Sequence, residues 1–304
     1  MSTQTNAMPG SSAESRIVTP AVIPLERQVY WALRREFWEN RFIYLGPLGV
    51  AALFLFVFLI HLPLHGASGL DPGKQRGAII EPYDMAAALL MGTFLFVAMF
   101  YCIETLQRER RDRSILFWKS LPVSDVTTVL TKASIPFLLL PLICCAIAIV
   151  TQFIMLLASS VALGVSGRSV AAYWDQVSLF RASLLLVYHV MTVHVLWGAP
   201  IYGWLLLVSA WARRAALLWA VLPPLAIGTL EKLLFNTTYF AAFVGRFFTG
   251  GAEGSYPPGT MPMDPGTHLT PFRFLGTPGL WIGLAVTAAF LAAAVRLRRY
   301  REPA

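Results

Sequence analysis

Six apolar stretches, each about twenty residues long, limit what this chain can fold into, because a helix of that length spans the hydrocarbon core of a bilayer. They cover residues 42–62, 86–106, 135–157, part of 183–210, 215–234 and 279–295. Charged residues make up only 13% of the chain, about half the share found in soluble domains. The sequence therefore predicts an all-α integral membrane protein with six transmembrane helices.

The basic residues between these stretches predict the orientation of the chain. Most of the 24 Lys and Arg residues lie in the amino-terminal tail, the loop between the second and third helices, the Arg213–Arg214 turn and the carboxyl-terminal tail. Cytoplasmic segments carry such an excess, so we expect both termini in the cytoplasm of a multi-pass protein in a bacterial-type inner membrane. Because this bias accounts for the net charge of +8, we expect no nucleic-acid partner.

The chain outside the spans divides into three segments. Residues 1–24 are rich in Ser, Thr, Ala and Pro and contain no apolar run, so we expect a disordered cytoplasmic tail. Residues 25–41 are expected to form a helix. Residues 42–296 would be the six-helix transmembrane domain, and residues 297–304 a second cytoplasmic tail.

The helix expected at residues 25–41 has a moderate amphipathic pattern. Val29, Leu33 and Phe37 repeat every four residues, and Arg27, Arg34 and Arg41 repeat every seven. Glu36 and Asn40 interrupt the apolar side. The pattern favours an interfacial helix in the headgroup layer, with its apolar stripe toward lipid and its arginines toward phosphates. An ordinary cytoplasmic helix is the alternative.

The loop between the second and third spans holds the most informative motif. A charged run from Arg108 to Arg113 is followed by the apolar cluster 115–118. Pro122 then ends this segment, and Ser124 can cap a new helix. An apolar cluster among charges is typical of a protein docking site. Alternatively, Phe117 and Trp118 anchor the loop in the headgroup layer, and the residues alone leave both interpretations open.

This loop resembles the one after the second helix of ABC-2 type permeases, the membrane subunits of one class of ATP-binding-cassette exporter. The resemblance lies in the run Glu109-Arg110-Arg111-Asp112-Arg113-Ser114, in Ile115 and Leu116, and in Leu121-Pro122-Val123-Ser124. In that family the loop forms a coupling helix that sits in a groove of the ATPase subunit. The coupling residues that the resemblance implies are Arg110, Asp112, Arg113, Ile115, Leu116, Trp118, Leu121, Pro122 and Ser124.

The resemblance also implies partners and a pathway. Two permease chains, identical or similar, would assemble with two ATPase chains in membrane lipids, and the second and fifth helices would line the substrate route. Pro223 and Pro224 lie in the middle of the fifth span. Each proline removes a backbone donor, so we expect a kink there, near the route.

The chain itself has no G-x-x-x-x-G-K-[ST] phosphate loop, so we expect it to be no enzyme. ATP and magnesium would bind the partner ATPase, and no cofactor is expected in this chain. Two alternatives are a membrane-embedded enzyme acting on lipid-type substrates and a non-transporting membrane scaffold.

The histidines give no sign of a metal site. His189 and His194 share the fourth span, and five residues of an α-helix would place them about 140° apart. They are therefore not expected to reach one ion together. The three cysteines fall inside apolar runs, where we expect them to act as small packing residues.

Overall fold

The computed structural model describes residues 24–62, 72–111, 124–167, 169–249 and 274–300, which form helices and no strand. Six helical segments are long and apolar enough to cross a membrane. They are Phe42–Ile60, Ile79–Arg111, Asp125–Val165, Leu179–Trp197, Ala216–Phe235 and Pro278–Tyr300. Each overlaps one of the six stretches predicted from the sequence, so the all-α class and the six spanning helices are confirmed.

The described elements follow one another along the chain. In order they are α1 (Leu25–Glu39), α2 (Phe42–Ile60), α3 (Pro72–Arg111), α5 (Asp125–Ser134), the π-helix η1 (Ile135–Leu139), α6 (Leu140–Val165), α7 (Val170–Val177), α8 (Leu179–His189), the π-helix η2 (Val190–Trp197), α9 (Ala199–Trp211), α10 (Ala216–Phe235), α11 (Tyr239–Thr249) and α13 (Pro278–Tyr300).

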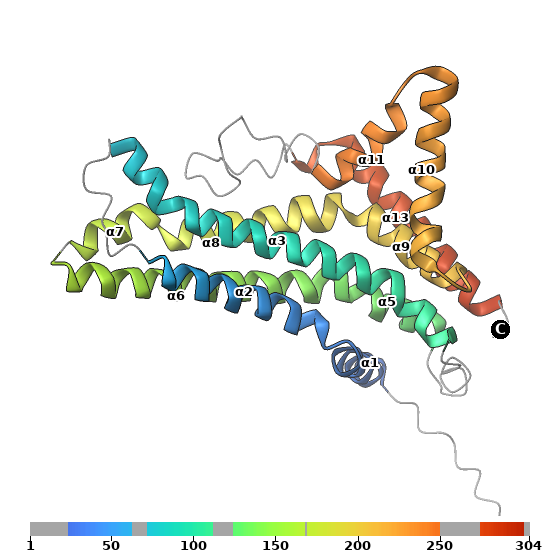
Figure 1. The fold of residues 1–304 in the computed structure, drawn as a ribbon. Coiled ribbons are helices and arrows are strands. Elements are labelled where there is room, and N and C mark those ends of the chain that lie inside the picture. Colours follow the sequence, from blue (N-terminus) through green and yellow to red (C-terminus); the bar gives the residue numbers. More distant parts are fainter. Residues whose placement is uncertain (1–23, 63–71, 112–123, 168, 250–273, 301–304) are drawn as a thin grey trace, which may run out of the picture.

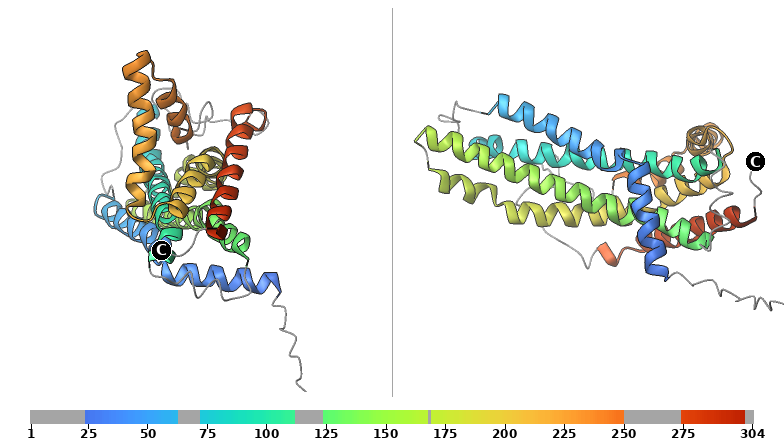
Figure 2. Two further views of the ribbon diagram at one scale, coloured as in Figure 1. Left: turned by 90° about the vertical axis from the view of Figure 1, so that its right-hand side faces the viewer. Right: turned by 90° about the horizontal axis from the view of Figure 1, so that it is seen from below.

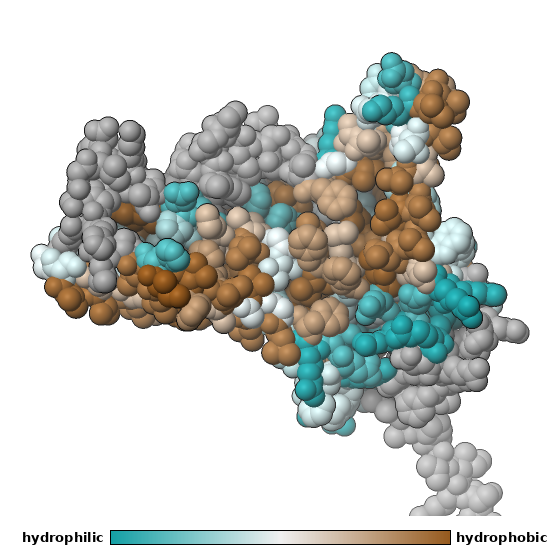
Figure 3. Space-filling model, viewed as in Figure 1, coloured by the Kyte–Doolittle hydropathy of each residue, from teal (hydrophilic) through white to brown (hydrophobic). Residues whose placement is uncertain are grey.

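Helices α2, α3, α6 and α8 run alongside one another, and α9 packs between α3 and α13 (Figure 1). The core between them is apolar, with Ile43, Phe94, Tyr101, Tyr202 and Leu206 fully or almost fully buried. Helix α1 runs crosswise to the other helices, next to the beginning of α2 (Figure 2). Hydrophobic residues cover the flanks of the bundle, and hydrophilic ones gather at the end near α1 (Figure 3).

The third span is longer than the apolar pattern predicted, because the polar helix α5 continues into it. Ser124 caps α5: its Oγ accepts a hydrogen bond from the Thr127 N–H at 3.0 Å. This confirms the predicted cap. Pro136 lies in η1, and since proline lacks an N–H and clashes with the preceding turn, the helix widens there instead of continuing as a regular α-helix.

The fourth span also contains a π-helix, and it corrects the expected placement of the histidines. In η2 the hydrogen bonds join residues five apart, so His189 and His194 come onto the same face. Their ring centroids are 5.5 Å apart. The predicted separation was wrong because it assumed a regular α-helix. At the end of η2, a Cβ on Gly198 would lie 2.4 Å from the His194 carbonyl oxygen, so only glycine fits.

Helix α10 diverges from the bundle (Figure 1) and buries only Ala216 and Ala220. It runs through Pro223 and Pro224 as one α-helix, with both prolines half-buried. Its contacts are with α9, α3 and α11. The first two turns of α10 are therefore its main attachment to the bundle.

Helix α11 lies between the fifth and sixth spans predicted from the sequence. Glu231, at the end of α10, caps it: the carboxylate accepts the N–H groups of Tyr239 and Phe240 at 2.7 and 2.8 Å. The Trp197 indole donates to the Arg246 carbonyl at 2.6 Å. These contacts hold α11 against η2.

Candidate functional site

Four charged side chains meet at the end of the bundle crossed by α1. Glu36 comes from α1, Glu109 from α3, Lys132 from α5 and Arg298 from α13, and each side chain is at most 5% exposed. Burying a charge is costly unless it is paired and hydrogen-bonded. The arrangement of these groups therefore decides how four helices fit together. We call these four residues the ionic cluster.

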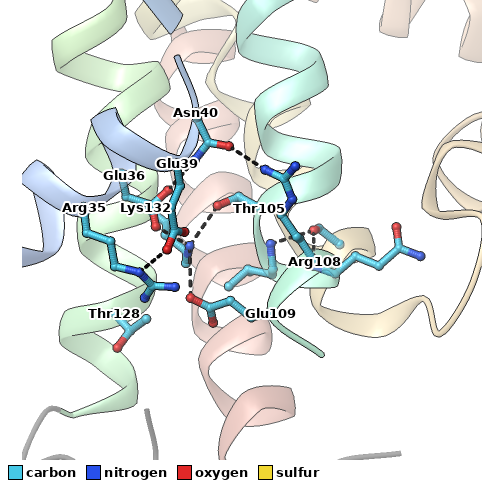
Figure 4. Close-up of polar contacts among 12 residues, drawn as sticks. Arg35, Glu36, Glu39, Asn40, Thr105, Arg108, Glu109, Thr128 and Lys132 are labelled. Atoms are coloured by element: carbon cyan, nitrogen blue, oxygen red, sulfur yellow. Dashed lines mark hydrogen bonds and ion pairs between the residues drawn. The ribbon is translucent and has the colours of Figure 1, made fainter. Parts of the chain in front are cut away.

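Lys132 occupies the centre of the ionic cluster (Figure 4). Its Nζ lies 2.5 Å from Glu36 Oε1 and 3.1 Å from Glu109 Oε1, and it donates to Thr105 Oγ1 at 3.0 Å. An ammonium group has three N–H donors. All three are used, so the charge is fully satisfied within the protein.

Glu36 is held from its other side by α1 and α3. Its Oε2 accepts hydrogen bonds from the Tyr101 hydroxyl at 2.8 Å and from Asn40 Nδ2 at 3.1 Å. Glu36 and Asn40 are the two residues that interrupt the apolar side of α1. They interrupt it because this side faces the protein.

The orientation predicted for α1 is thereby corrected. Leu33 and Phe37, expected to point toward lipid, pack against the protein core. The stripe turns inward because Glu36, between them, reaches Lys132. The outer face carries Trp31, Arg34 and Trp38 instead, with the Arg34 guanidinium over both indoles at 5.2 and 5.9 Å.

Arg298 pairs with one residue on each side of the 112–123 segment. Its Nε lies 3.0 Å from Asp125 Oδ1, and its guanidinium also pairs with Glu109 Oε2. Glu109 precedes the 112–123 segment and Asp125 follows it. One side chain from α13 therefore fixes both ends of the loop.

Arg110 ties the end of α3 to the end of α9. It donates to the carbonyl oxygens of Ser209 and Ala212 at 2.6 and 2.9 Å. The last carbonyls of a helix have no partner within it, and basic side chains commonly bind them. The Ser209 hydroxyl in turn accepts the N–H groups of Leu106 and Gln107 at 3.1 and 3.0 Å.

Two of the predicted coupling residues, Arg110 and Ser124, are described, one on each side of the loop. The others lie outside the described residues: Asp112, Arg113, Ile115, Leu116, Trp118, Leu121 and Pro122. The pathway prolines Pro223 and Pro224 are on α10, which contributes nothing to the ionic cluster.

Sequence reasoning missed the ionic cluster as a site. The available signal was a charge where the pattern demands an apolar residue: Glu36 within the stripe of α1, and Lys132 four residues before Pro136 in the third span. Lys and Glu are almost never fully buried unless paired. Every charge in the cluster has an opposite partner, so the cluster is suited to holding the four helices together.

A polar pocket of about 340 Å³ opens beside the ionic cluster, between α1, α3 and α5 (Figure 4). It is lined by Arg35, Glu36, Glu39, Asn40, Thr105, Arg108, Glu109 and Lys132. Its lining therefore includes three members of the cluster and the more exposed charges around them.

The six spanning helices define a multi-pass membrane protein. No protein-family model matches the chain, and comparisons with curated proteins and with solved structures give no match either.

Proposed function

We propose that this chain is the permease subunit of an ABC exporter of the ABC-2 type, driven by ATPase subunits on separate chains. The observation that supports this most is the base of the 112–123 loop. The motif that resembles a coupling loop is flanked by Glu109 and Asp125, which Arg298 bridges. Lys132 in turn bridges Glu109 and Glu36. A segment that receives force from a partner needs such a rigid base.

In this proposal the ionic cluster carries movement from the loop into the membrane. A displacement of the loop moves α3 and α5 together, because Arg298 and Lys132 bridge them. The same two side chains pass the displacement to α13 and to α1. Arg110 passes the displacement to α9 as well, through its hydrogen bonds to two carbonyl oxygens at the end of that helix. The second and fifth spans, α3 and α10, would then change the route between them.

The proposal includes a topology and partners. Both termini and the 112–123 loop face the cytoplasm of a bacterial-type inner membrane, and α1 lies along the membrane surface. Two permease chains, identical or similar, pair above two ATPase chains that hold ATP and magnesium. A catalytic role in lipid chemistry has less support, since the cluster has no charge left for a substrate.

The test is co-purification from native membranes. The wild-type chain should recover a protein with Walker motifs in stoichiometric amount. The Leu116→Asp/Leu121→Asp variant should lose it, because a docked loop would bury two unpaired carboxylates at a cost of several kcal/mol. Tyr300→Asp, a change at an exposed site on the end of α13, serves as the matched control.

Two results would contradict the proposal. One is full recovery of the ATPase with the double variant, which would show that the apolar cluster only anchors the loop in the headgroup layer. The other is a wild-type preparation that never contains an ATPase, which would favour a scaffold role. Monodisperse gel filtration of each variant shows whether the chain is folded.

A further inference from the structure

The floor of the pocket beside the ionic cluster is closed to a ligand. Lys132 uses its three N–H groups on Glu36, Glu109 and Thr105. One carboxylate oxygen of Glu109 pairs with Lys132 and the other with Arg298. Both oxygens of Glu36 also accept hydrogen bonds, from Lys132 and Tyr101. Whatever occupies the pocket therefore binds at its rim.

The rim offers one cation and one carboxylate oxygen. Arg108 is exposed and donates one hydrogen bond, from a terminal nitrogen to Asn40 Oδ1 at 3.2 Å. A guanidinium has five N–H donors, and the described residues accept only this one from Arg108. Glu39 gives Oε1 to Arg35 at 2.5 Å. Its Oε2 has no partner within the described parts of the chain.

The charges around the pocket cancel. Arg35, Arg108 and Lys132 face Glu36, Glu39 and Glu109 in the lining. A purely anionic ligand would therefore meet three carboxylates as well as three cations. Electrostatic complementarity favours a ligand that carries one negative and one positive group.

The position of the pocket indicates that such a ligand would be a lipid headgroup at the membrane surface. The apolar part of α3 ends at Glu104, and Arg108 follows one helical turn later. Helix α1, on the other side, exposes Trp31 and Trp38. Tryptophan is enriched at the headgroup level of membranes, and an arginine near the end of a spanning helix extends its side chain to that level. A volume of 340 Å³ has room for about ten waters, which is the scale of a lipid headgroup.

We propose that this pocket binds the phosphoethanolamine headgroup of a membrane phospholipid. Arg108 donates its remaining N–H groups to the phosphate, and Glu39 Oε2 accepts from the ammonium group. The lipid then fills the gap between α1 and α3 next to the ionic cluster. This inference rests on the proposed placement of α1 at the membrane surface and is independent of coupling to an ATPase.

The test is native mass spectrometry of the purified full chain with two probe lipids of identical acyl chains, phosphatidylethanolamine and phosphatidylglycerol. The wild type should retain phosphatidylethanolamine preferentially. Arg108→Gln should weaken that binding about tenfold, since hydrogen bonds to a charged group are lost. Glu39→Gln should remove the preference between the two lipids. Arg27→Gln, which removes an exposed α1 arginine outside the pocket lining, should change nothing.

Several outcomes would overturn the inference. Equal retention of both lipids by the wild type would refute the zwitterionic headgroup. An equal effect of Arg27→Gln and Arg108→Gln would reduce the binding to nonspecific attraction by arginines. Displacement of the lipid by millimolar inorganic phosphate or glycerophosphoethanolamine would assign the pocket to a soluble phosphate. Because the isolated chain is used, recovery or loss of an ATPase partner does not affect the result.

Discussion

The ammonium nitrogen of Lys132 lies 2.5 Å from Glu36 Oε1, although the two residues are 96 positions apart in the chain. This contact joins a helix that precedes the first span to the beginning of the third. Both side chains are 4% exposed, so water cannot replace either partner. The docking of α1 on the bundle therefore depends on keeping both charges.

The first prediction concerns this pair. Lys132→Met leaves Glu36 buried without its cation, and we expect a loss of about 3–5 kcal/mol, the usual cost of breaking a buried pair. Glu36→Gln/Lys132→Met should recover much of it, because no charge is left without its partner and the amide oxygen still accepts from Tyr101 and Asn40, while Glu109 keeps Arg298. Thermal unfolding in detergent measures both. A double variant as unstable as the single one would show that the pair does not act as a unit.

The second prediction concerns the ends of the loop. Arg298→Gln removes the bridge between Glu109 and Asp125. Glutamine can keep at most one of these two contacts. Losing the other, a hydrogen bond to a charged group worth about 1.5 kcal/mol, raises about tenfold the population of molecules in which α3 and α5 separate. Tryptic cleavage at Arg113 and Lys119 should accelerate by that factor. The exposed neighbour Arg299 gives the control: Arg299→Gln should cleave at the wild-type rate, and equal rates for both variants would remove Arg298 from this role.

The third prediction concerns the end of η2. Gly198→Ala places a Cβ 2.4 Å from the His194 carbonyl oxygen, and overpacking of this kind costs about 1–3 kcal/mol. Gly92→Ala is the matched change, since a Cβ on Gly92 meets nothing within 4 Å. It should leave stability unchanged or raise it by up to about 1 kcal/mol, because alanine favours a helix. The midpoints of thermal unfolding should therefore move apart, and a Gly198→Ala protein as stable as wild type would contradict the geometry of η2.

The fourth prediction concerns orientation. In a cysteine-free background, Ser68→Cys and Thr260→Cys should react with an impermeant thiol reagent added outside intact cells. Ser11→Cys and Ser120→Cys should react only after the cells are opened. The expectation follows from the excess of Lys and Arg on one side of the membrane. The reverse pattern of labelling would invert the topology and remove the 112–123 loop from the reach of a cytoplasmic ATPase.

The spanning helices could be predicted because their signal is local and continuous: about twenty apolar residues in a row need no partner to be recognised. The cap at Ser124 is also local, since the hydroxyl binds an N–H three residues away. Helix α11 escaped prediction because its cap is the carboxylate of Glu231, eight residues earlier on another helix.

The ionic cluster could not be predicted from spacing. Glu109 and Arg298 are 189 positions apart, and no sequence period connects them. Glu36 interrupts the apolar stripe of α1, and the amphipathic pattern does not indicate a buried partner for it, because the pattern assumes that polar residues face water. The predicted angle between His189 and His194 was wrong for a different reason. The π-helix η2 has more residues per turn than an α-helix, so residues five apart lie on the same face.

The pairing of Lys132 with Glu36 also constrains how this chain can change over generations. Replacing either residue alone leaves a charge buried without its partner, whereas replacing both by uncharged residues, with a hydrogen-bond acceptor kept at position 36 for Tyr101, avoids that cost. Natural variants of this protein should therefore alter the two positions together. Arg27, Arg296 and Arg299, whose side chains are exposed, can change one at a time.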